Sequence, residues 1–425
     1  MSFIGRWAWH DVKLAGDLVG LLGGGGGPYL SKTEALALEG PLGPAPDRVG
    51  VDERWSGRGR VLLCSSNGAG LGHLTRLMAV ARRLPAPVDA VFVTMSHGVP
   101  LVTREGYVAE YIPSAANLNA DARMWHRYLR QRMDALIDHY RPDVLVFDGV
   151  SLYRGLLDSW RTHERCTRVW LRRAMWRSGT EVPPEHVDVF DLILEPDDIA
   201  AAHDIGATTT DLARVHRVNP VVHLDERELL QREAAREALR LDPNRRCALL
   251  SLGAGNINNT AALVKRITTT LRANADVQVV TLRAPIAIQR NPAASDDVLV
   301  RTVYPVSRYL RAFDVAFAAA GYNSFHELIA FGVPTVFVPN EHAVVDDQAA
   351  RATFAEWAGA ALAVSEWSTD ELVARVEAVL NPHVQARLAA QCRRVFPGNG
   401  AADAAALLAT RAVARHEPTR LGIGV

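Results

Sequence analysis

His73 is the side chain in this sequence that is best placed to act as a general base. It ends a glycine-rich loop, residues 65–73, which follows a short apolar strand predicted over 61–64 and leads into a predicted helix. An imidazole titrates near neutral pH, so it can accept a proton from an attacking hydroxyl group. A histidine at the start of a helix can instead cap that helix or position a substrate. The residues alone leave these roles open.

Asp148 is the second candidate for acid–base chemistry. It lies at the end of a buried strand predicted over 142–149. In a doubly wound sheet, the carboxyl ends of the strands border the crevice where ligands bind. Asp148 could therefore orient His73 or act as an alternative base. It could also cap the helix predicted over 152–160, and this is the role that we favour from the sequence.

The stretch from Asp314 to Gln348 determines how the rest of the chain is interpreted. It contains an apolar strand over 315–319, a turn at Gly321, a helix over 324–331 and a second apolar strand over 334–338. A strand, a helix and a strand in this order form a βαβ unit, which requires a parallel sheet. The N–H groups at the start of such a helix can bind an anion such as a phosphate.

Polar residues follow both ends of this unit. Glu327 lies one turn inside the helix, and Asp346, Asp347 and Gln348 follow the second strand, where they are placed to bind ribose and sugar hydroxyls. The spacing of Ser324 and Glu327 is also that of a capping box, in which each side chain binds a free N–H group at the helix end. Spacing alone does not decide between these roles.

This segment resembles the nucleotide-sugar-binding signature of GT-B glycosyltransferases, especially the group that contains the N-acetylglucosaminyltransferase of peptidoglycan synthesis. The matching positions are Asp314, Gly321, Asn323, Ser324, Glu327, Gly332, Pro334, Pro339, Asp347 and Gln348. The resemblance implies an α/β protein of the GT-B fold, in which two Rossmann-like, doubly wound parallel-sheet domains face each other across a cleft. It extends over residues 60–415.

The resemblance also assigns further residues to the site. The loop after the strand predicted over 246–252 faces the donor diphosphate in the family, and here it carries Gly-Ala-Gly in place of the usual Gly-Gly-Ser. The donor-binding residues implied are Gly253, Gly255, Asn256, Val303, Tyr304, Gly321, Asn323, Ser324, Glu327, Asp347 and Gln348. On the acceptor side the implied residues are Gly70, Gly72 and Asp148, with His73 as the base.

Length and composition are those of a soluble globular protein with two domains. The chain has 425 residues, and Lys+Arg equals Asp+Glu at 47 each, so no net charge attracts it to nucleic acid. We expect an N-terminal extension of unknown role (1–57), an acceptor-side domain (58–218), a donor-binding domain (219–400) and a C-terminal helix and tail (401–425) that packs back toward the first domain. The four scattered cysteines indicate neither a zinc site nor disulfides.

The first 57 residues are unusual in composition. Apolar residues at helical spacing between Trp7 and Leu22 precede five consecutive glycines. Such a helix can lie on a membrane or, more commonly, dock on its own protein. Because the sequence shows neither a secretory signal nor an apolar run long enough to span a bilayer, we expect a cytoplasmic protein. Peripheral contact with the inner face of a membrane remains an alternative.

A cluster of arginines follows a strand of the first half. Arg168, Arg172, Arg173 and Arg177 surround Trp170 and Trp176. Guanidinium groups bind phosphates well, so the cluster could hold a phosphate-bearing acceptor. It could equally form a solvated face, which is the interpretation we favour from the sequence.

The resemblance implies transfer of a sugar from a nucleoside diphosphate sugar to an acceptor hydroxyl, with inversion. A UDP-sugar is the expected donor, with UDP-N-acetylglucosamine as the specific candidate. The acceptor would be a lipid-linked sugar, a glycan or a small natural product. We expect no metal and no cofactor, because helix N-termini can stabilise the diphosphate and no Asp-x-Asp motif is present. The alternatives are a UDP-sugar 2-epimerase-like isomerase, for which Asp148 and His97 are weak candidates, and a non-catalytic nucleotide-sugar-binding scaffold.

Overall fold

A computed structural model describes residues 59–66, 71–209, 213–252, 261–274, 276–283, 298–340, 343, 345–364 and 369–413. The predictions for Gly70, Gly253, Gly255 and Asn256 fall outside these residues. So do the predictions for the N-terminal extension.

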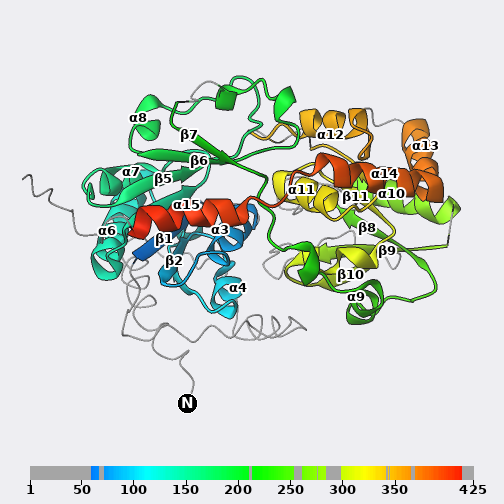
Figure 1. Cartoon of the computed structure of the whole chain (residues 1–425), viewed down its shortest axis with the longest axis horizontal. Helices are drawn as coiled ribbons and strands as arrows, with labels where there is room; N and C mark the ends of the chain where they lie inside the picture. The colour runs from blue at the N-terminus through cyan, green and yellow to red at the C-terminus, as the bar shows by residue number, and fades with distance from the viewer. Residues whose placement is uncertain are drawn as a thin grey trace, which may run out of the picture.

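Seven parallel strands form the first sheet, in the order β3-β2-β1-β4-β5-β6-β7 (Figure 1). The strands are β1 (Gly59–Ser65), β2 (Val88–Thr94), β3 (Val108–Tyr111), β4 (Val144–Asp148), β5 (Thr167–Leu171), β6 (Leu192–Pro196) and β7 (Val215–Val218). The connecting helices are α3 (Gly72–Ala81), α4 (Val99–Arg104), α5 (Ala115–Leu118), α6 (Ala122–Tyr140), α7 (Arg154–Trp160) and α8 (Pro184–Val187), with 3₁₀ turns η2 (Ala201–His203) and η3 (Ala207–Thr209). Strands such as β4 are apolar and buried, because helices cover both faces of a parallel sheet.

Six parallel strands form the second sheet, in the order β10-β9-β8-β11-β12-β13. They are β8 (Arg246–Ser251), β9 (Val277–Arg283), β10 (Leu299–Thr302), β11 (Val315–Ala318), β12 (Thr335–Phe337) and β13 (Leu362–Ala363). The helical elements are η4 (Glu226–Glu228), α9 (Arg232–Ala238), α10 (Ala261–Asn274), η5 (Val306–Ala312), α11 (Tyr322–Ala330), α12 (Gln348–Trp357), α13 (Thr369–Leu380) and α14 (Pro382–Val395). The prediction of two doubly wound parallel sheets is therefore confirmed.

In each sheet the strand order reverses at one place, between β1 and β4 in the first sheet and between β8 and β11 in the second. In open α/β sheets, ligands bind at this topological switch point, beyond the carboxyl ends of the strands. Ser65 at the end of β1 is in register with Asp148 at the end of β4. Ser251 at the end of β8 is likewise in register with Ala318 at the end of β11. Two candidate half-sites thus lie where the fold class places ligands.

The last described helix, α15 (Ala401–Val413), belongs to the core of the first sheet although it follows the second sheet in the chain. Figure 1 shows it in red alongside β1 and α3. Apart from Leu408, its buried side chains are alanines, including Ala404, Ala405 and Ala412. A Cβ atom added to Gly59 would lie only 2.9 Å from the Cβ of Ala412. Small residues on both elements therefore permit this close packing, which joins the two halves at a second point.

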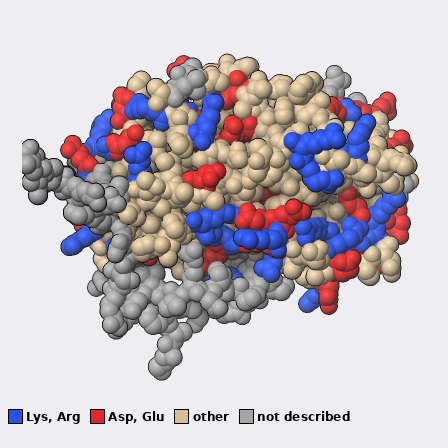
Figure 2. All heavy atoms as spheres, in the orientation of Figure 1, with Lys and Arg blue, Asp and Glu red and all other residues tan. Residues whose placement is uncertain are grey.

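Basic and acidic side chains are intermixed over the face shown in Figure 2. This agrees with the balanced charge of the whole chain. Among the helices that the structure describes, none is both long enough and apolar enough to cross a membrane.

Candidate active site

His73 and Asp148 form a hydrogen-bonded pair at the switch point of the first sheet. Nδ1 of His73, in the first turn of α3, lies 2.6 Å from Oδ1 of Asp148 at the end of β4. Arg76, one turn further along α3, binds the same carboxylate through Nε, at 2.8 Å from Oδ2, and through Nη2. An ionised Asp148 accepts the Nδ1 proton of His73, which leaves Nε2 as the basic nitrogen.

The local charges keep this pair in the protonation states that a base needs. Burial lowers the pKa of His73; Asp148 opposes that effect, while Arg76 and Arg173 reinforce it, and the net pKa lies below the usual value. Burial raises the pKa of Asp148, but Arg76 and His73 outweigh it and the net pKa is lowered. At neutral pH the imidazole is therefore uncharged and the carboxylate is ionised. The His73 side chain is still 20% exposed, so it remains accessible to a substrate.

One prediction for these residues is wrong, and one alternative is excluded. Asp148 does not cap the helix that follows it: the N-cap residue of α7 is Tyr153, and the Asp148 carboxylate binds His73 and Arg76 instead. His73 does not cap α3 either, because the N-cap position is Leu71 and no side chain caps this helix end. Neither side chain is a helix cap, and the two are bonded to each other instead.

The capping-box interpretation of Ser324 and Glu327 is also wrong. Helix α11 begins two residues earlier than predicted, at Tyr322, with Gly321 as its N-cap residue and no side-chain cap. Glu327 thus lies in the second turn, where it is half-buried. Burial raises the pKa of Glu327, against the opposing effects of His223 and of the Ser307 hydroxyl. The first N–H groups of α11 lack a side-chain cap, as an anion-binding helix end requires.

Gln348 and Asp347 are adjacent in the chain and were assigned the same role from the sequence, but their surroundings differ. The amide of Gln348 lies over the start of α11, because a Cβ atom added to Gly321 would be 3.6 Å from its Nε2. Nε2 also donates to Oδ2 of Asp346 at 3.3 Å. The Asp347 carboxylate accepts a hydrogen bond from the Ala350 N–H at 3.0 Å and caps α12. The structure therefore brings Gln348 to the turn at Gly321 and holds Asp347 at a helix end.

Ion pairs link four side chains of alternating charge next to Gln348. Asp346 Oδ1 binds Arg351 Nη1 at 2.7 Å and Arg173 Nη1 at 3.0 Å. Arg351 Nε in turn binds Asp198 Oδ2 at 2.6 Å, and both of these side chains are fully buried. Arg173 and Asp198 follow β5 and β6 of the first sheet, whereas Asp346 and Arg351 belong to the second. The chain of ion pairs therefore joins the two halves.

The arginine cluster after β5 is not the solvated face that we expected. Arg172 is 4% exposed and pairs with Glu195, which is fully buried. Arg173 is 16% exposed and pairs with Asp346. Arg168, near the start of β5, pairs with the half-exposed Asp191 at the surface. Arg172 and Arg173 are therefore built into the interior through ion pairs.

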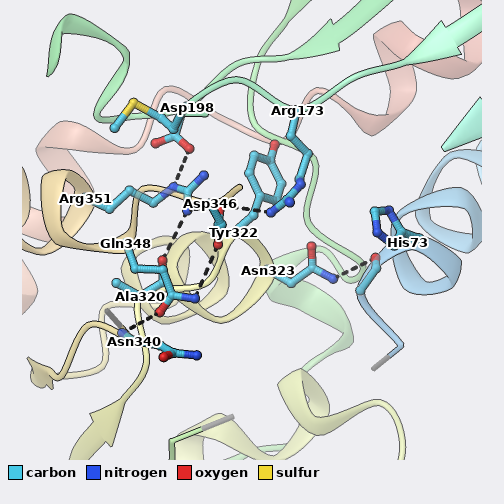
Figure 3. Close-up of polar contacts among 12 residues, drawn as sticks. His73, Arg173, Asp198, Ala320, Tyr322, Asn323, Asn340, Asp346, Gln348 and Arg351 are labelled. Carbon is cyan, nitrogen blue, oxygen red and sulfur yellow. Dashed lines mark hydrogen bonds and ion pairs between the residues drawn. The ribbon is translucent and has the colours of Figure 1, made fainter. Parts of the chain in front are cut away.

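The acceptor-side loop and the donor-side turn meet directly. Nδ2 of Asn323 donates to the carbonyl oxygen of Gly72 at 3.1 Å. Figure 3 shows His73 on one side of this contact and Asp346, Gln348 and Arg351 on the other. The hydroxyl of Tyr322 reaches the segments after β6 and β7, accepting from the Val221 N–H and donating to the Asp197 carbonyl, both at 3.1 Å. Helix α11 is thus attached to the first domain at its first two residues.

The predicted base-binding position also lies at this boundary. Val303 and Tyr304 are buried after β10, and the Tyr304 hydroxyl lies 3.0 Å from Oγ1 of Thr75 in α3. Burial raises the pKa of Tyr304 well above its usual value, so its hydroxyl is protonated. No group of three or more His, Cys, Asp or Glu side chains suited to a metal ion occurs among the residues that the structure describes.

Sequence reasoning missed several residues of this constellation. Arg76 lies three residues after His73 on a predicted helix, a spacing that places both on one face and could have identified it. Asp346 was placed beside Asp347 and Gln348 from the sequence, but its pairing with Arg173 and Arg351 was not foreseen. Asp198 and Arg351 carry no local signal, because only the packing of the two halves brings them together.

Comparisons with known proteins show what the chain resembles in sequence and in fold. Residues 251–408 match the family model described as "Glycosyltransferase family 28 C-terminal domain". A stretch of 96 residues, 22% of this chain, is 29% identical to the UDP-N-acetylglucosamine–N-acetylmuramyl-(pentapeptide) pyrophosphoryl-undecaprenol N-acetylglucosamine transferase of Bacillus licheniformis. The aligned stretch spans about a quarter (26%) of that relative's length.

Solved structures extend the similarity to both halves of the chain. MurG of Acinetobacter baumannii superposes with a TM-score of 0.55 at 16% identity, covering 82% of this chain and 99% of its own. The glycotransferase of kitacinnamycin gives 0.58 at 20% identity, covering 83% and 99%. The spinosyn forosaminyltransferase SpnP gives 0.57 at 17% identity, covering 82% and 98%. The fold is therefore GT-B, and the resemblance inferred from the sequence is confirmed.

Proposed function

We propose that this chain is an inverting glycosyltransferase that moves a sugar from a nucleoside diphosphate sugar to an acceptor hydroxyl. One observation carries the proposal: a neutral histidine held by a buried carboxylate faces the uncapped start of a helix in a donor-site signature. The two parts approach closely, since Asn323 of that helix bonds the backbone of Gly72 beside His73. The family match over residues 251–408 supports the donor side of this assignment.

In the proposed reaction, Nε2 of His73 takes the proton of the acceptor hydroxyl as the oxygen attacks the anomeric carbon. The bond from that carbon to the diphosphate oxygen breaks, and the electron pair leaves with the diphosphate. Direct displacement inverts the anomeric configuration. Asp148 fixes the tautomer of His73 and stabilises the imidazolium that forms, as a carboxylate partner does in other histidine bases.

Charge develops on the leaving diphosphate, and N–H groups at the start of α11 are placed to stabilise it. We propose that the loop at Gly253, Gly255 and Asn256 contributes further N–H groups and that no metal is needed. Glu327 would accept hydrogen bonds from the ribose hydroxyls, and Gln348 would bind the transferred sugar. The backbone at Val303 and Tyr304 would contact the base.

A UDP-sugar is the proposed donor. The curated relative is named for UDP-N-acetylglucosamine, whereas a structural relative, the spinosyn rhamnosyltransferase SpnG, is described in complex with thymidine diphosphate. The acceptors in these names are a lipid-linked sugar and a spinosyn aglycone. We propose a hydroxyl-bearing acceptor from this range, a lipid-linked sugar, a glycan or a natural product.

Calorimetric titration without added metal tests the donor site. The purified protein is titrated with UDP-N-acetylglucosamine, UDP-glucose, UDP, GDP and dTDP. We expect micromolar binding of UDP that Glu327→Ala abolishes while the fold is retained. Failure of the folded protein to bind any of these nucleotides would overturn the proposal.

The His73→Ala variant separates the transferase from its alternatives. Retained donor binding with loss of sugar transfer fits a transferase, whereas unchanged biological function fits a scaffold. For an epimerase, His97 would have to join the site. Its ring instead bonds Asn117, after β3. No observation favours the epimerase.

A further inference from the structure

We propose that Arg173, which follows β5 in the first domain, is a positioning residue for the donor-sugar loop, defined here as residues 345–348. This inference rests on the proposed function, because the loop carries Gln348. The donor site would then be built by both domains, and the same guanidinium would couple it to the base.

The backbone of the loop is already joined to the segment that follows β5. Trp176 and Asp346 form an isolated antiparallel β-bridge. The Arg177 N–H donates to the Val345 carbonyl at 2.7 Å, and the Asp347 N–H donates to the Met175 carbonyl at 3.0 Å. Hydrogen bonds on both sides of Asp346 thus fix its backbone against the first domain. The conformation of this loop is not a property of the second sheet alone.

Side chains then transmit the position of Arg173 to Gln348. Arg173 and Arg351 bind the same oxygen, Oδ1 of Asp346, at 3.0 and 2.7 Å. The other oxygen, Oδ2, accepts from Nε2 of Gln348 at 3.3 Å. Asp346 is only 12% exposed on its side chain and Arg173 16%, so these charge-assisted bonds are largely shielded from water. Two arginines therefore orient the carboxylate that orients the sugar-binding amide.

The charge of Arg173 also acts on His73. Figure 3 shows its side chain extending between His73 and Asp346. The charged groups that face His73 are Asp148 from β4, Arg76 from α3 and Arg173 itself, and the positive charge of Arg173 lowers the pKa of His73. In the other direction, Asp148 and Asp346 both act on Arg173. One cation thus helps to keep the base neutral and to hold the sugar loop.

The chain offers a matched set of variants. Arg173→Gln removes the positive charge, whereas Arg173→Lys keeps the charge but loses the planar guanidinium. Asp346→Asn removes the negative charge of the carboxylate that Arg173 binds. Arg168→Gln is the control, because Arg168 lies near the start of β5, before Arg173, and pairs with Asp191 instead of Asp346. Binding of UDP and of UDP-N-acetylglucosamine is measured by calorimetry, and the pKa of His73 by NMR titration of its ring.

We expect Arg173→Gln to weaken UDP-N-acetylglucosamine binding roughly tenfold, the loss typical of one hydrogen bond to a charged group, while UDP binding is unchanged. The pKa of His73 should rise in Arg173→Gln but not in Arg173→Lys. Asp346→Asn should weaken sugar-nucleotide binding similarly, and the double variant should lose less than the two single losses combined. Arg168→Gln should match the wild type.

The outcomes separate the inference from the proposed function. Folded wild-type protein that binds none of the five nucleotides named above contradicts both. Wild-type protein that binds UDP and UDP-N-acetylglucosamine, with an Arg173→Gln variant that binds them equally well and keeps the same His73 pKa, overturns only the inference. Equal losses of UDP and sugar-nucleotide binding would also overturn it, since they would indicate general damage. If Arg173→Gln does not fold, Arg173→Lys and Asp346→Asn decide by the same measurements.

Discussion

His73 and Asp148 are separated by 75 positions in the chain, yet Nδ1 of the histidine lies 2.6 Å from Oδ1 of the aspartate. The contact follows from the order of the first sheet, in which β1 and β4 are neighbours although β2 and β3 come between them in the chain. His73 begins the helix after β1, and Asp148 ends β4. The switch point of the sheet therefore assembles the pair.

Asp148→Asn should reduce sugar transfer by about 10²–10⁴-fold, the range that a positioned general base contributes. The amide cannot stabilise an imidazolium, and it can present the wrong group to Nδ1 of His73. Donor binding by calorimetry should be unchanged, because Asp148 belongs to the proposed acceptor side. Asp158→Asn is the matched control, since that carboxylate lies on the surface of α7 beside Arg154. Unchanged transfer by a folded Asp148→Asn protein would exclude the pair from catalysis.

The pH dependence of transfer should have an acidic limb below the ordinary histidine range. Burial lowers the pKa of His73, and the base is active only when neutral. The kcat/KM value should therefore stay constant down through pH 7 and fall only when the pH drops through this lowered pKa. A profile measured with saturating acceptor checks this. A loss of activity that begins above pH 7 would show that another group, or a histidine with a raised pKa, controls the reaction.

The sequence was sufficient to predict the parts of the fold that depend on local pattern. The strand, glycine turn and helix at Gly321 belong to a βαβ unit, and the parallel sheet follows from that unit because parallel strands need a crossover. The predicted start of α11 was two residues too late, at Ser324, whereas the helix begins at Tyr322. The spacing of Ser324 and Glu327 satisfies a capping box on paper, but a shift of two residues moves both side chains off the cap positions.

The long-range electrostatics could not be predicted in the same way. Asp198 and Arg351 are 153 positions apart and lie on different sheets, so no spacing rule connects them. The arginine cluster around Arg173 was wrongly predicted to be a solvated face, for a related reason. Arginine next to tryptophan is common on solvated surfaces, and only the approach of Asp346 from the second domain makes Arg173 part of the interior.

His326 should make the stability of the protein depend on pH. It is fully buried in α11, and Nδ1 donates to the Tyr322 carbonyl at 2.7 Å while Nε2 accepts from the Ile199 N–H at 3.2 Å. Burial lowers its pKa from 6.5 to about 4. The unfolded chain therefore binds this proton at higher pH than the native protein does. Stability should fall as the pH drops from 6.5 toward 4, by about 3 kcal/mol in total.

Urea unfolding at a series of pH values from 7 to 4.5 measures this effect. The difference in unfolding free energy between wild type and His326→Gln should shrink as the pH falls, because only the wild type must protonate this imidazole on unfolding. His383→Gln is the control, since His383 is exposed on α14. A difference that does not change with pH would show that His326 is not held neutral.

The ion pair between Asp198 and Arg351 should be costly to break. The two groups lie 2.6 Å apart with no exposed surface, and they join the segment after β6 to α12. Asp198→Ala leaves the Arg351 charge buried with only Asp346 opposite, so it should lower the unfolding free energy by about 3–5 kcal/mol. Asp276→Ala, which breaks the exposed pair with Arg245, should cost about 0–1 kcal/mol.

The double variant Asp198→Ala, Arg351→Met distinguishes a buried unpaired charge from a simple loss of packing. Removing both charges should restore part of the stability that Asp198→Ala loses, because no uncompensated guanidinium remains in the interior. The recovery would be incomplete, since Asp346 loses the Arg351 guanidinium and keeps Arg173 and the Gln348 amide as partners. Urea unfolding of the three proteins at pH 7 measures these differences. If the double variant were less stable than Asp198→Ala, Arg351 would contribute through its packing and its bond to Asp346, and the pair with Asp198 would not be what holds the two halves together.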